Sequence, residues 1–219
     1  MNPVLLKMGI KEKRFGDKII FSETEIEIRD GELVAITGPS GAGKTTLIRM
    51  LSGMDGDWDG EYFFKDAPIG PKERFHRIKG VCSFVLQNVQ LLEYLNAEEN
   101  ILLPFRYRKD RCDQSLFDEI VSTLDIRSLL KQKASTLSGG EKQRIAIARA
   151  LIVSPNVIFA DEPTGSLDDT NVALTMNLLK SSCRRQGCAL VMVTHRLSLL
   201  SEFDRSFEIK DEKISRVSL

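Results

Sequence analysis

The segment from Gly38 to Thr45 constrains the fold of this chain more than any other feature. It matches the pattern GxxxxGK[ST], in which glycines let backbone N–H groups converge on phosphate oxygens. Residues 33–36 form a continuous apolar run, typical of a strand buried on both faces, and a helix is expected from about Lys44. A glycine-rich loop between a buried strand and a helix is the setting that a phosphate-binding loop requires. The sequence therefore predicts an α/β fold built around a phosphate site.

The chemistry of such a loop assigns roles to its side chains. Lys44 neutralises the β and γ phosphates of a bound nucleotide, and the hydroxyl group of Thr45 can coordinate Mg²⁺. The helix that follows adds the positive end of its dipole. A chance glycine-rich turn is the alternative, and it does not account for the flanking strand and helix. The residues expected to contact ATP are Gly38, Pro39, Ser40, Gly41, Ala42, Gly43, Lys44, Thr45 and Thr46.

Two carboxylates follow a second apolar run at residues 157–160. Asp161 and Glu162 stand at the carboxyl end of this expected strand, where ligands bind in open α/β sheets. Asp161 is expected to hold Mg²⁺, often through water, and Glu162 is expected to accept a proton from an attacking water molecule. The alternative is a pair of surface carboxylates at a strand end, which the phosphate-binding loop makes less attractive.

The rest of the pattern alternates strands and helices. Residues 4–6 and 19–28 are expected to form a half-exposed antiparallel sheet, and residues 96–152 to be largely helical. Further strands are expected at 157–160 and 189–193, with a helix at 171–185 between them and a hairpin at 207–217. Alternating strands and helices predict a parallel core sheet. The absence of repeats and linkers in the sequence favours one compact unit.

Composition limits the functional classes to which this chain can belong. The formal net charge is zero, so we expect no nucleic-acid partner. No stretch approaches the roughly 18 apolar residues that span a bilayer, and the N-terminal lysines precede no apolar signal region. We therefore expect an unexported, cytoplasmic chain. Reduced thiols are expected, because neither CxxC nor histidine-paired spacing occurs among Cys82, Cys112, Cys183 and Cys188.

A second phosphate-binding device is expected at residues 137–144, which read Leu-Ser-Gly-Gly-Glu-Lys-Gln-Arg. A serine hydroxyl group and two glycine amides at the start of a helix offer a positive end to a phosphate. The alternative makes Ser138 a helix N-cap, with Glu141 completing a capping box. Both interpretations can hold together, because an N-cap and an anion site use the same geometry.

With these motifs, the sequence resembles the nucleotide-binding subunits of ABC transporters, whose signature is the Leu137–Arg144 segment. The resemblance covers essentially the whole chain, and segments 91–101 and 160–168 are similar to the LolD, MacB and FtsE group. It implies a P-loop NTPase of the RecA-like class, a parallel-sheet core with an N-terminal antiparallel β subdomain and an inserted α-helical subdomain. The expected division of this single ABC ATPase domain, residues 1–219, is about 1–87 and 153–219 for the core and β subdomain, and 88–152 for the helical subdomain.

The resemblance also assigns individual residues. Gln87 is expected to touch Mg²⁺ or the attacking water, and His195 to contact the γ-phosphate. Asp168 belongs to a loop that crosses a dimer interface in relatives. The family usually places a tyrosine near the N-terminus to stack on adenine, and this chain offers Phe15 instead. Stacking needs a π-face and no hydroxyl group, although a phenylalanine in a turn can also simply pack against the sheet.

The resemblance implies that two copies sandwich two ATP molecules. Each ATP is held by Lys44, Thr45, Asp161 and Gln87 of one copy and covered by Ser138, Gly139 and Gly140 of the other. The implied partner is a transmembrane permease subunit, which places the chain peripherally on the inner face of the cell membrane, for export or for lipoprotein or peptide translocation. The alternatives are an FtsE-like mechanical or signalling ATPase without solute transport, and a soluble ABC ATPase.

Overall fold

The computed structural model describes residues 2–108, 111–163 and 169–217, and its strands form two sheets. The antiparallel sheet has the order β2-β1-β4-β5. Its strands are β1 (Val4–Phe15), β2 (Lys18–Arg29), β4 (Asp59–Phe64) and β5 (Ala67–Pro68). Ile26 and Ile28 are buried while Glu23 and Glu25 are exposed. The predicted half-exposed antiparallel sheet is therefore confirmed.

The second sheet is the core of the fold and has the order β10-β9-β3-β8-β7-β6. Its strands are β3 (Leu33–Thr37), β6 (Cys82–Leu86), β7 (Val157–Asp161), β8 (Ala189–Val193), β9 (Arg205–Lys210) and β10 (Lys213–Val217). Strands β6, β7, β8, β3 and β9 pair in parallel, and β10 returns antiparallel to β9 as the predicted closing hairpin. Strands β3 and β8 are buried at every position, which explains their continuous apolar sequences.

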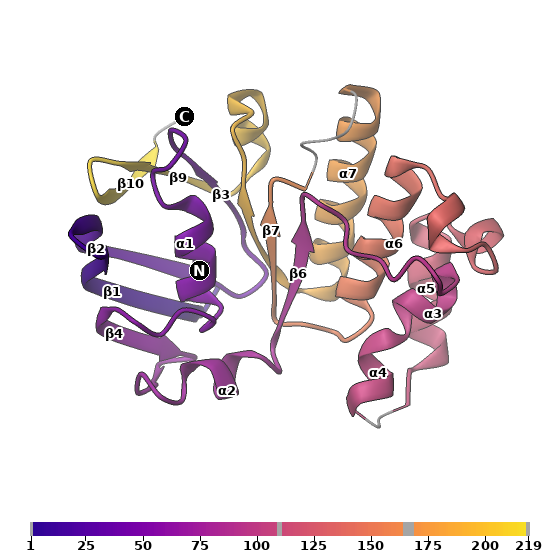
Figure 1. Ribbon diagram of the computed structural model, residues 1–219, viewed down its shortest axis with the longest axis horizontal. Coiled ribbons are helices and arrows are strands. Elements are labelled where there is room, and N and C mark those ends of the chain that lie inside the picture. Colours follow the sequence, from indigo (N-terminus) through magenta and orange to yellow (C-terminus); the bar gives the residue numbers. More distant parts are fainter. Residues whose placement is uncertain (1, 109–110, 164–168, 218–219) are drawn as a thin grey trace.

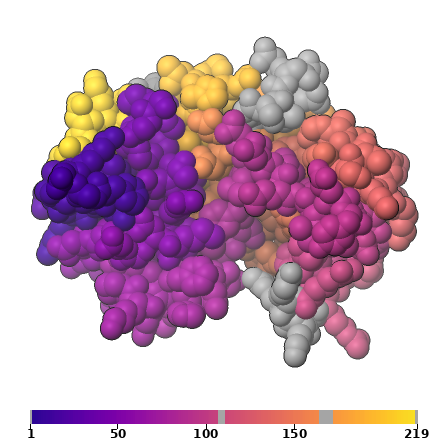
Figure 2. Space-filling model, viewed as in Figure 1, coloured from indigo at the N-terminus to yellow at the C-terminus, as the bar shows by residue number. Residues whose placement is uncertain are grey.

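Helices cover both faces of the core sheet (Figure 1). They are α1 (Lys44–Leu51), α2 (Arg74–Ile78), α3 (Ala97–Ile101), α4 (Leu103–Arg108), α5 (Gln114–Thr123), α6 (Gly139–Leu151) and α7 (Asp169–Gln186). Short 3₁₀ helices lie at Arg127–Leu129, Ala134–Thr136 and Leu197–Glu202. Residues 97–151, which we call the helical lobe, form one end of the molecule, and the antiparallel sheet lies at the other end (Figure 2). The predicted helical insert is confirmed. In the described parts of the chain, no helix has the length and apolar character needed to cross a membrane.

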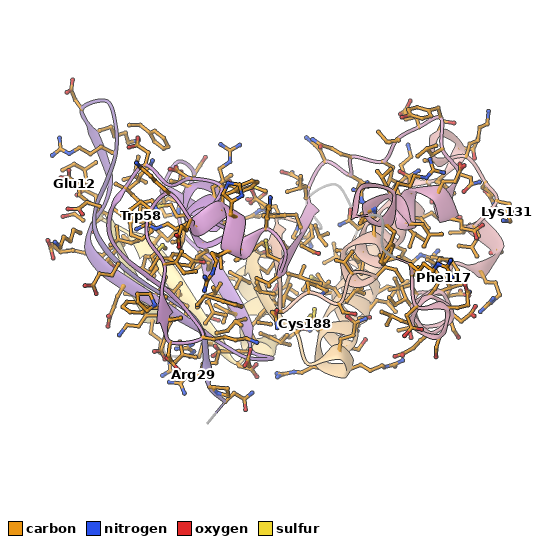
Figure 3. All side chains as sticks on the ribbon, turned by 90° about the horizontal axis from the view of Figure 1, so that it is seen from below. Glu12, Arg29, Trp58, Phe117, Lys131 and Cys188 are labelled. Atoms are coloured by element: carbon orange, nitrogen blue, oxygen red, sulfur yellow. The ribbon has the colours of Figure 1, made fainter. Side chains whose placement is uncertain are left out.

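Two hydrophobic clusters pack on opposite faces of the core sheet. One face, with Val34 and Ile36, packs with α1 and the antiparallel sheet, and the other, with Ala35, packs with the helical lobe and α7. Figure 3 shows Trp58 and Phe117 at opposite ends of the molecule. All four cysteines lie in the described part of the chain, and no disulfide joins them.

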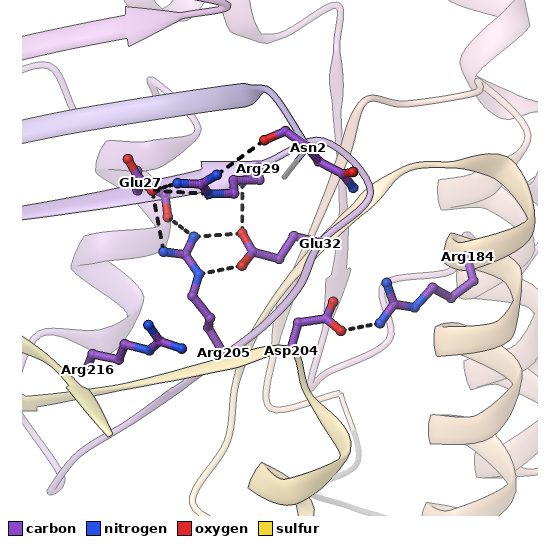
Figure 4. Close-up of a pocket in the computed structure, with 8 residues that line it drawn as sticks. All are labelled: Asn2, Glu27, Arg29, Glu32, Arg184, Asp204, Arg205 and Arg216. Carbon is purple, nitrogen blue, oxygen red and sulfur yellow. Dashed lines mark hydrogen bonds and ion pairs between the residues drawn. The ribbon is translucent and has the colours of Figure 1, made fainter. Parts of the chain in front are cut away.

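An ion-pair network ties the two sheets and α7 together at the amino end of β3. Arg205 on β9 donates to both oxygens of Glu32, and its guanidinium group lies 3.6 Å from the Glu27 carboxylate of β2. The hydrogen bonds that Arg205 donates to the Glu32 carboxylate raise the pKa of Arg205. Arg184 on α7 pairs with Asp204 beside it, and a hollow of about 470 Å³ opens among these side chains (Figure 4). Because β3 runs away from this end toward the phosphate-binding loop, the hollow is not the nucleotide site.

Candidate functional site

The loop between β3 and α1 has the backbone that its sequence predicts. Gly38 and Gly43 have φ angles of 146° and 102°, which only glycine adopts at low cost. A Cβ atom on Gly38 would lie 2.5 Å from the carbonyl oxygen of Ile209, and one on Gly43 would lie 2.6 Å from Ile20. Both glycines are therefore required by backbone conformation and by close neighbours.

The first turn of α1 is open toward a ligand. Its N-cap, Gly43, offers no side-chain hydrogen bond, and the first turn carries no acidic residue. The ammonium group of Lys44 lies 2.9 Å from the carbonyl oxygens of Gly38 and of Pro39, so the loop itself holds this cation in place. Orphan N–H groups and a lysine at one helix start suit a phosphate chain.

Thr45 and Asp161 meet across the fold, although they are far apart in the sequence. The hydroxyl group of Thr45, on α1, donates to the Asp161 carboxylate at the end of β7 over 2.9 Å. Mg²⁺ prefers hard oxygen ligands and often takes one or two from protein beside substrate phosphates. The hydroxyl group and the carboxylate thus fit the metal that the sequence predicts.

Four parallel strands end in register at this edge of the core sheet. Ile36 pairs with Val193, Val193 with Asp161, and Asp161 with Leu86. The residues that follow these positions therefore leave the same edge; they are Thr37, Thr194, Glu162 and Gln87. Gln87 is exposed there. Ligands of open α/β sheets bind at this carboxyl edge.

Glu162 is held in an uncommon backbone conformation next to His195. Its φ angle is 46°, and its N–H group donates to the carbonyl oxygen of Val193 over 3.1 Å. A non-glycine residue with positive φ is uncommon, and such residues gather at functional sites. The Glu162 carboxylate lies 3.4 Å from Nδ1 of His195, whose side chain is 60% exposed. The two side chains that the sequence assigns to catalysis and to γ-phosphate contact are thus neighbours.

The start of α6 carries both halves of the expected capping box. The Ser138 hydroxyl group accepts from the N–H group of Glu141, and the Glu141 carboxylate accepts from the N–H and hydroxyl groups of Ser138. These hydrogen bonds from Ser138 lower the pKa of the Glu141 carboxyl. Ser138 and Gly139 are nevertheless exposed, and Gly140 is half-buried. The N-cap prediction is confirmed, and the segment remains accessible to a ligand from outside the chain.

Phe15 is the last residue of β1, in the hairpin that β1 forms with β2. Its side chain is 55% exposed, so the ring is not simply packed against the sheet. Across the hairpin, Ile20 and Phe21 both approach Gly43. The ammonium group of Lys13 lies 4.5 Å from the centre of the Phe15 ring. No sequence signal marks Lys13, because its partner aspartate is 42 positions away. Asp168 lies outside the described residues.

Comparisons with known proteins show the family of this chain. A family model described as ABC transporter matches residues 21–165. The lipoprotein-releasing system ATP-binding protein LolD of Leptospira interrogans is 35% identical over 206 residues, covering 92% of this chain and 87% of that protein. The macrolide export ATP-binding/permease protein MacB of Pasteurella multocida is 34% identical over 98% of this chain, which spans 34% of the MacB length.

A solved structure supplies the same fold. The dimeric ATP-binding cassette MJ0796, described in a post-hydrolysis state bound to ADP and Pi, superposes with a TM-score of 0.80 and 28% identity. The match covers 98% of this chain and all of that one. The predicted P-loop NTPase fold is confirmed. Since the family model covers more than half of the chain and the LolD relative is 35% identical over most of both proteins, this chain belongs to the ABC transporter family.

Proposed function

We propose that this chain is the ATP-binding subunit of an ABC transporter, an ATP hydrolase in which two copies sandwich two ATP molecules. Each copy holds one ATP on its loop between β3 and α1 and covers the other copy's ATP with Ser138, Gly139 and Gly140. The observation that carries the proposal is the 2.9 Å approach of the Thr45 hydroxyl group to Asp161. It joins the phosphate-binding loop to the strand end that carries Glu162.

ATP binding rests on the open start of α1. The Lys44 ammonium group exchanges its carbonyl partners in the loop for phosphate oxygens, whose full charges attract it more strongly. Thr45, Asp161 and Gln87 are the residues that would hold Mg²⁺, which supplies neutralisation of the charge on the β and γ phosphates. The exposed ring of Phe15 stacks on the adenine.

Hydrolysis rests on Glu162 and its neighbours. The Glu162 carboxylate accepts a proton from the attacking water molecule as general base. His195, 3.4 Å from that carboxylate, contacts the γ-phosphate and limits where Glu162 can point. Gln87 lies at the same sheet edge and orients the water. Asp168, which lies beyond the described residues, contributes at the interface between the two copies.

When the two copies close over ATP, nucleotide binding moves the helical subdomain. The start of α6 is exposed and positive, so it meets the γ-phosphate held by the partner copy. The chain acts as one ABC ATPase domain, with core and antiparallel sheet from about residues 1–87 and 153–219, and a helical subdomain from about 88–152. The helical subdomain moves on closure, and the closed dimer binds one of two conformations of the membrane partner more tightly. This difference in affinity shifts the population of the partner toward that conformation.

The partner is a transmembrane permease subunit, and the chain lies peripherally on the inner face of the cell membrane. The name of the LolD relative describes a lipoprotein-releasing system, and that of MacB describes macrolide export. These names favour transport, as export or as lipoprotein or peptide translocation, over an FtsE-like mechanical or signalling role. Affinity purification from membranes identifies the partner directly.

The sandwich is tested with a Glu162→Gln variant, which keeps the shape of the side chain and removes its basicity. This variant is expected to bind ATP without hydrolysing it, so its apparent mass in solution should double on addition of MgATP. A Lys44→Ala variant is the control and stays monomeric. A Glu162→Gln protein that remains monomeric under saturating MgATP would contradict the sandwich for the isolated subunit.

A further inference from the structure

Lys13 is a buried lysine with a fixed position on β1. Only 1% of its side chain is exposed. Its ammonium group donates to the Asp55 carboxylate over 2.9 Å and to the carbonyl oxygen of Asp57 over 2.7 Å. An ammonium group has three N–H donors, and these two acceptors leave one donor direction. The ammonium group also lies over the ring of Phe15, whose centre is 4.5 Å from the nitrogen.

The anchor of Lys13 belongs to the helix that follows the phosphate-binding loop. Asp55 lies just beyond α1, and its N–H group donates to the carbonyl oxygen of Arg49 in that helix over 3.0 Å. Its own carbonyl oxygen accepts from the indole of Trp58, and its carboxylate accepts from the N–H group of Asp57. The carboxylate is therefore held rigidly. Through it, the Lys13 ammonium group has a defined position relative to the helix that carries Lys44 and Thr45.

A β-bulge makes a second connection between the hairpin and the loop. Lys13 pairs with Phe21, but the next residue of β1 pairs with Ile19, so Ile20 is an extra residue on β2. Ile20 and Phe21 are consecutive and both buried, and both approach Gly43. The hairpin that carries Phe15 is thus fixed to the phosphate-binding loop at one point and to the far end of α1 at another.

From these contacts we propose that Lys13 is a positioning residue, which holds the ring of Phe15 so that its exposed face meets the adenine of ATP. A cation over one face of a ring leaves the opposite face for another partner, and 55% of Phe15 is exposed to solvent. The inference rests on the proposed stacking role of Phe15. It assigns Lys13 and Asp55 to recognition of the base, separate from the residues that bind the phosphates.

The test compares two probes on the full chain, MgATP and magnesium tripolyphosphate, which has phosphates and no base. Phe15→Ala is expected to weaken MgATP binding about tenfold, the typical loss of one base–aromatic stack. Lys13→Met is expected to weaken it about two- to fivefold, because a cation–π contact no longer orients the ring. Neither change is expected to alter tripolyphosphate binding. Lys11→Met is the matched control, since Lys11 is an exposed lysine of the same strand.

Combining the two substitutions separates positioning from a general structural role. If Lys13 acts through Phe15, Lys13→Met in the Phe15→Ala background weakens MgATP binding no further. In the single Lys13→Met variant, KM for ATP rises while kcat at saturating ATP is unchanged. Should Lys13→Met fail to fold, Asp55→Glu keeps both charges, displaces the ammonium group, and is expected to give the same pattern.

Distinct results overturn distinct claims. If Lys13→Met weakens tripolyphosphate as much as MgATP, or leaves MgATP binding unchanged while Phe15→Ala weakens it, the positioning role of Lys13 is wrong and the stacking role of Phe15 stands. If Phe15→Ala binds MgATP like the parent protein, the stacking proposal itself is wrong, and the inference about Lys13 falls with it.

Discussion

Substitution of Gly139 is expected to affect folding stability and ATP turnover in opposite directions. Gly139 is the first residue of α6, and its φ angle is not positive. A Cβ atom built on it meets no atom within 4 Å beyond its chain neighbours and the backbone of its own helix. No contact in the described chain therefore requires glycine here, in contrast to Gly38 and Gly43. If glycine is needed at this position, the need comes from a neighbour outside the chain.

The expected effects of Gly139→Ala have opposite signs. Alanine restricts the unfolded chain and favours helix, so the free energy of unfolding should rise by about 0.4–1 kcal/mol. For a chain of this length, that corresponds to an increase in Tm of about 1–4 °C. In the proposed sandwich the added methyl group would face the partner's nucleotide, and such overpacking is expected to cost about 1–3 kcal/mol, or roughly 5- to 150-fold in the closure equilibrium.

The assay measures Tm by calorimetry and ATP turnover on the same protein. Gly80→Ala is the matched control, because Gly80 is also exposed, has no positive φ angle and has no neighbour within 4 Å of an added Cβ atom. Gly80 lies on the loop before β6, so its substitution should leave turnover unchanged. A Gly139→Ala protein with parental turnover and parental ATP-dependent dimerisation would refute the reasoning that this glycine faces a second copy.

Three further outcomes follow from single contacts. Thr45→Val should lower ATP turnover about 100-fold or more through loss of a hydroxyl ligand at the phosphates, while Thr45→Ser retains most of it; steady-state assays of the two variants check this. Glu32→Gln should lower the free energy of unfolding in urea by about 2–4 kcal/mol and spare ATP binding, since it leaves the guanidinium group of Arg205 without its main counter-charge. Ser138 lowers the pKa of Glu141 in the folded chain. The stabilisation that the ionised Glu141 gives to the start of α6 is therefore fully present above about pH 4.3 and is lost as the pH falls through the lowered pKa. Hydrogen exchange at the start of α6 should show this loss in the parent protein and not in Glu141→Gln.

Much of the core could be predicted because its central strands β3, β7 and β8 are almost entirely apolar. The strands at 33–37, 157–161 and 189–193 and the helix α1 lie where the pattern placed them. Strand β4 was missed, since its Asp59-Gly60-Glu61 start is polar and carries a glycine. The reason for that glycine is tertiary: a Cβ atom on Gly60 would lie 2.1 Å from the carbonyl oxygen of Gly9 on β1. Sequence periodicity carries no information about that approach.

The candidate site was likewise predictable only in part from the sequence. Parallel topology predicts that residues after β6, β7 and β8 meet at one edge, and Gln87, Glu162 and His195 follow these strands as expected. Lys13 escaped prediction because a charged residue in a strand reads as exposed, whereas its partner Asp55 is supplied by a loop far along the sequence. The capping box at Ser138 was predicted from spacing alone. Its role toward a second copy stays a prediction, because that role involves atoms of another chain.

Complementation between two inactive variants tests the composite site most directly. Lys44→Ala removes the phosphate-binding lysine, and Ser138→Arg blocks the cover while leaving ATP binding intact. Each protein alone should be inactive. Mixed dimers keep one complete site, built from Lys44 of one chain and Ser138 of the other, so an equimolar mixture should recover turnover that neither variant shows alone. A mixture as inactive as its separate components would contradict the claim that each ATP is bound by one copy and covered by the other.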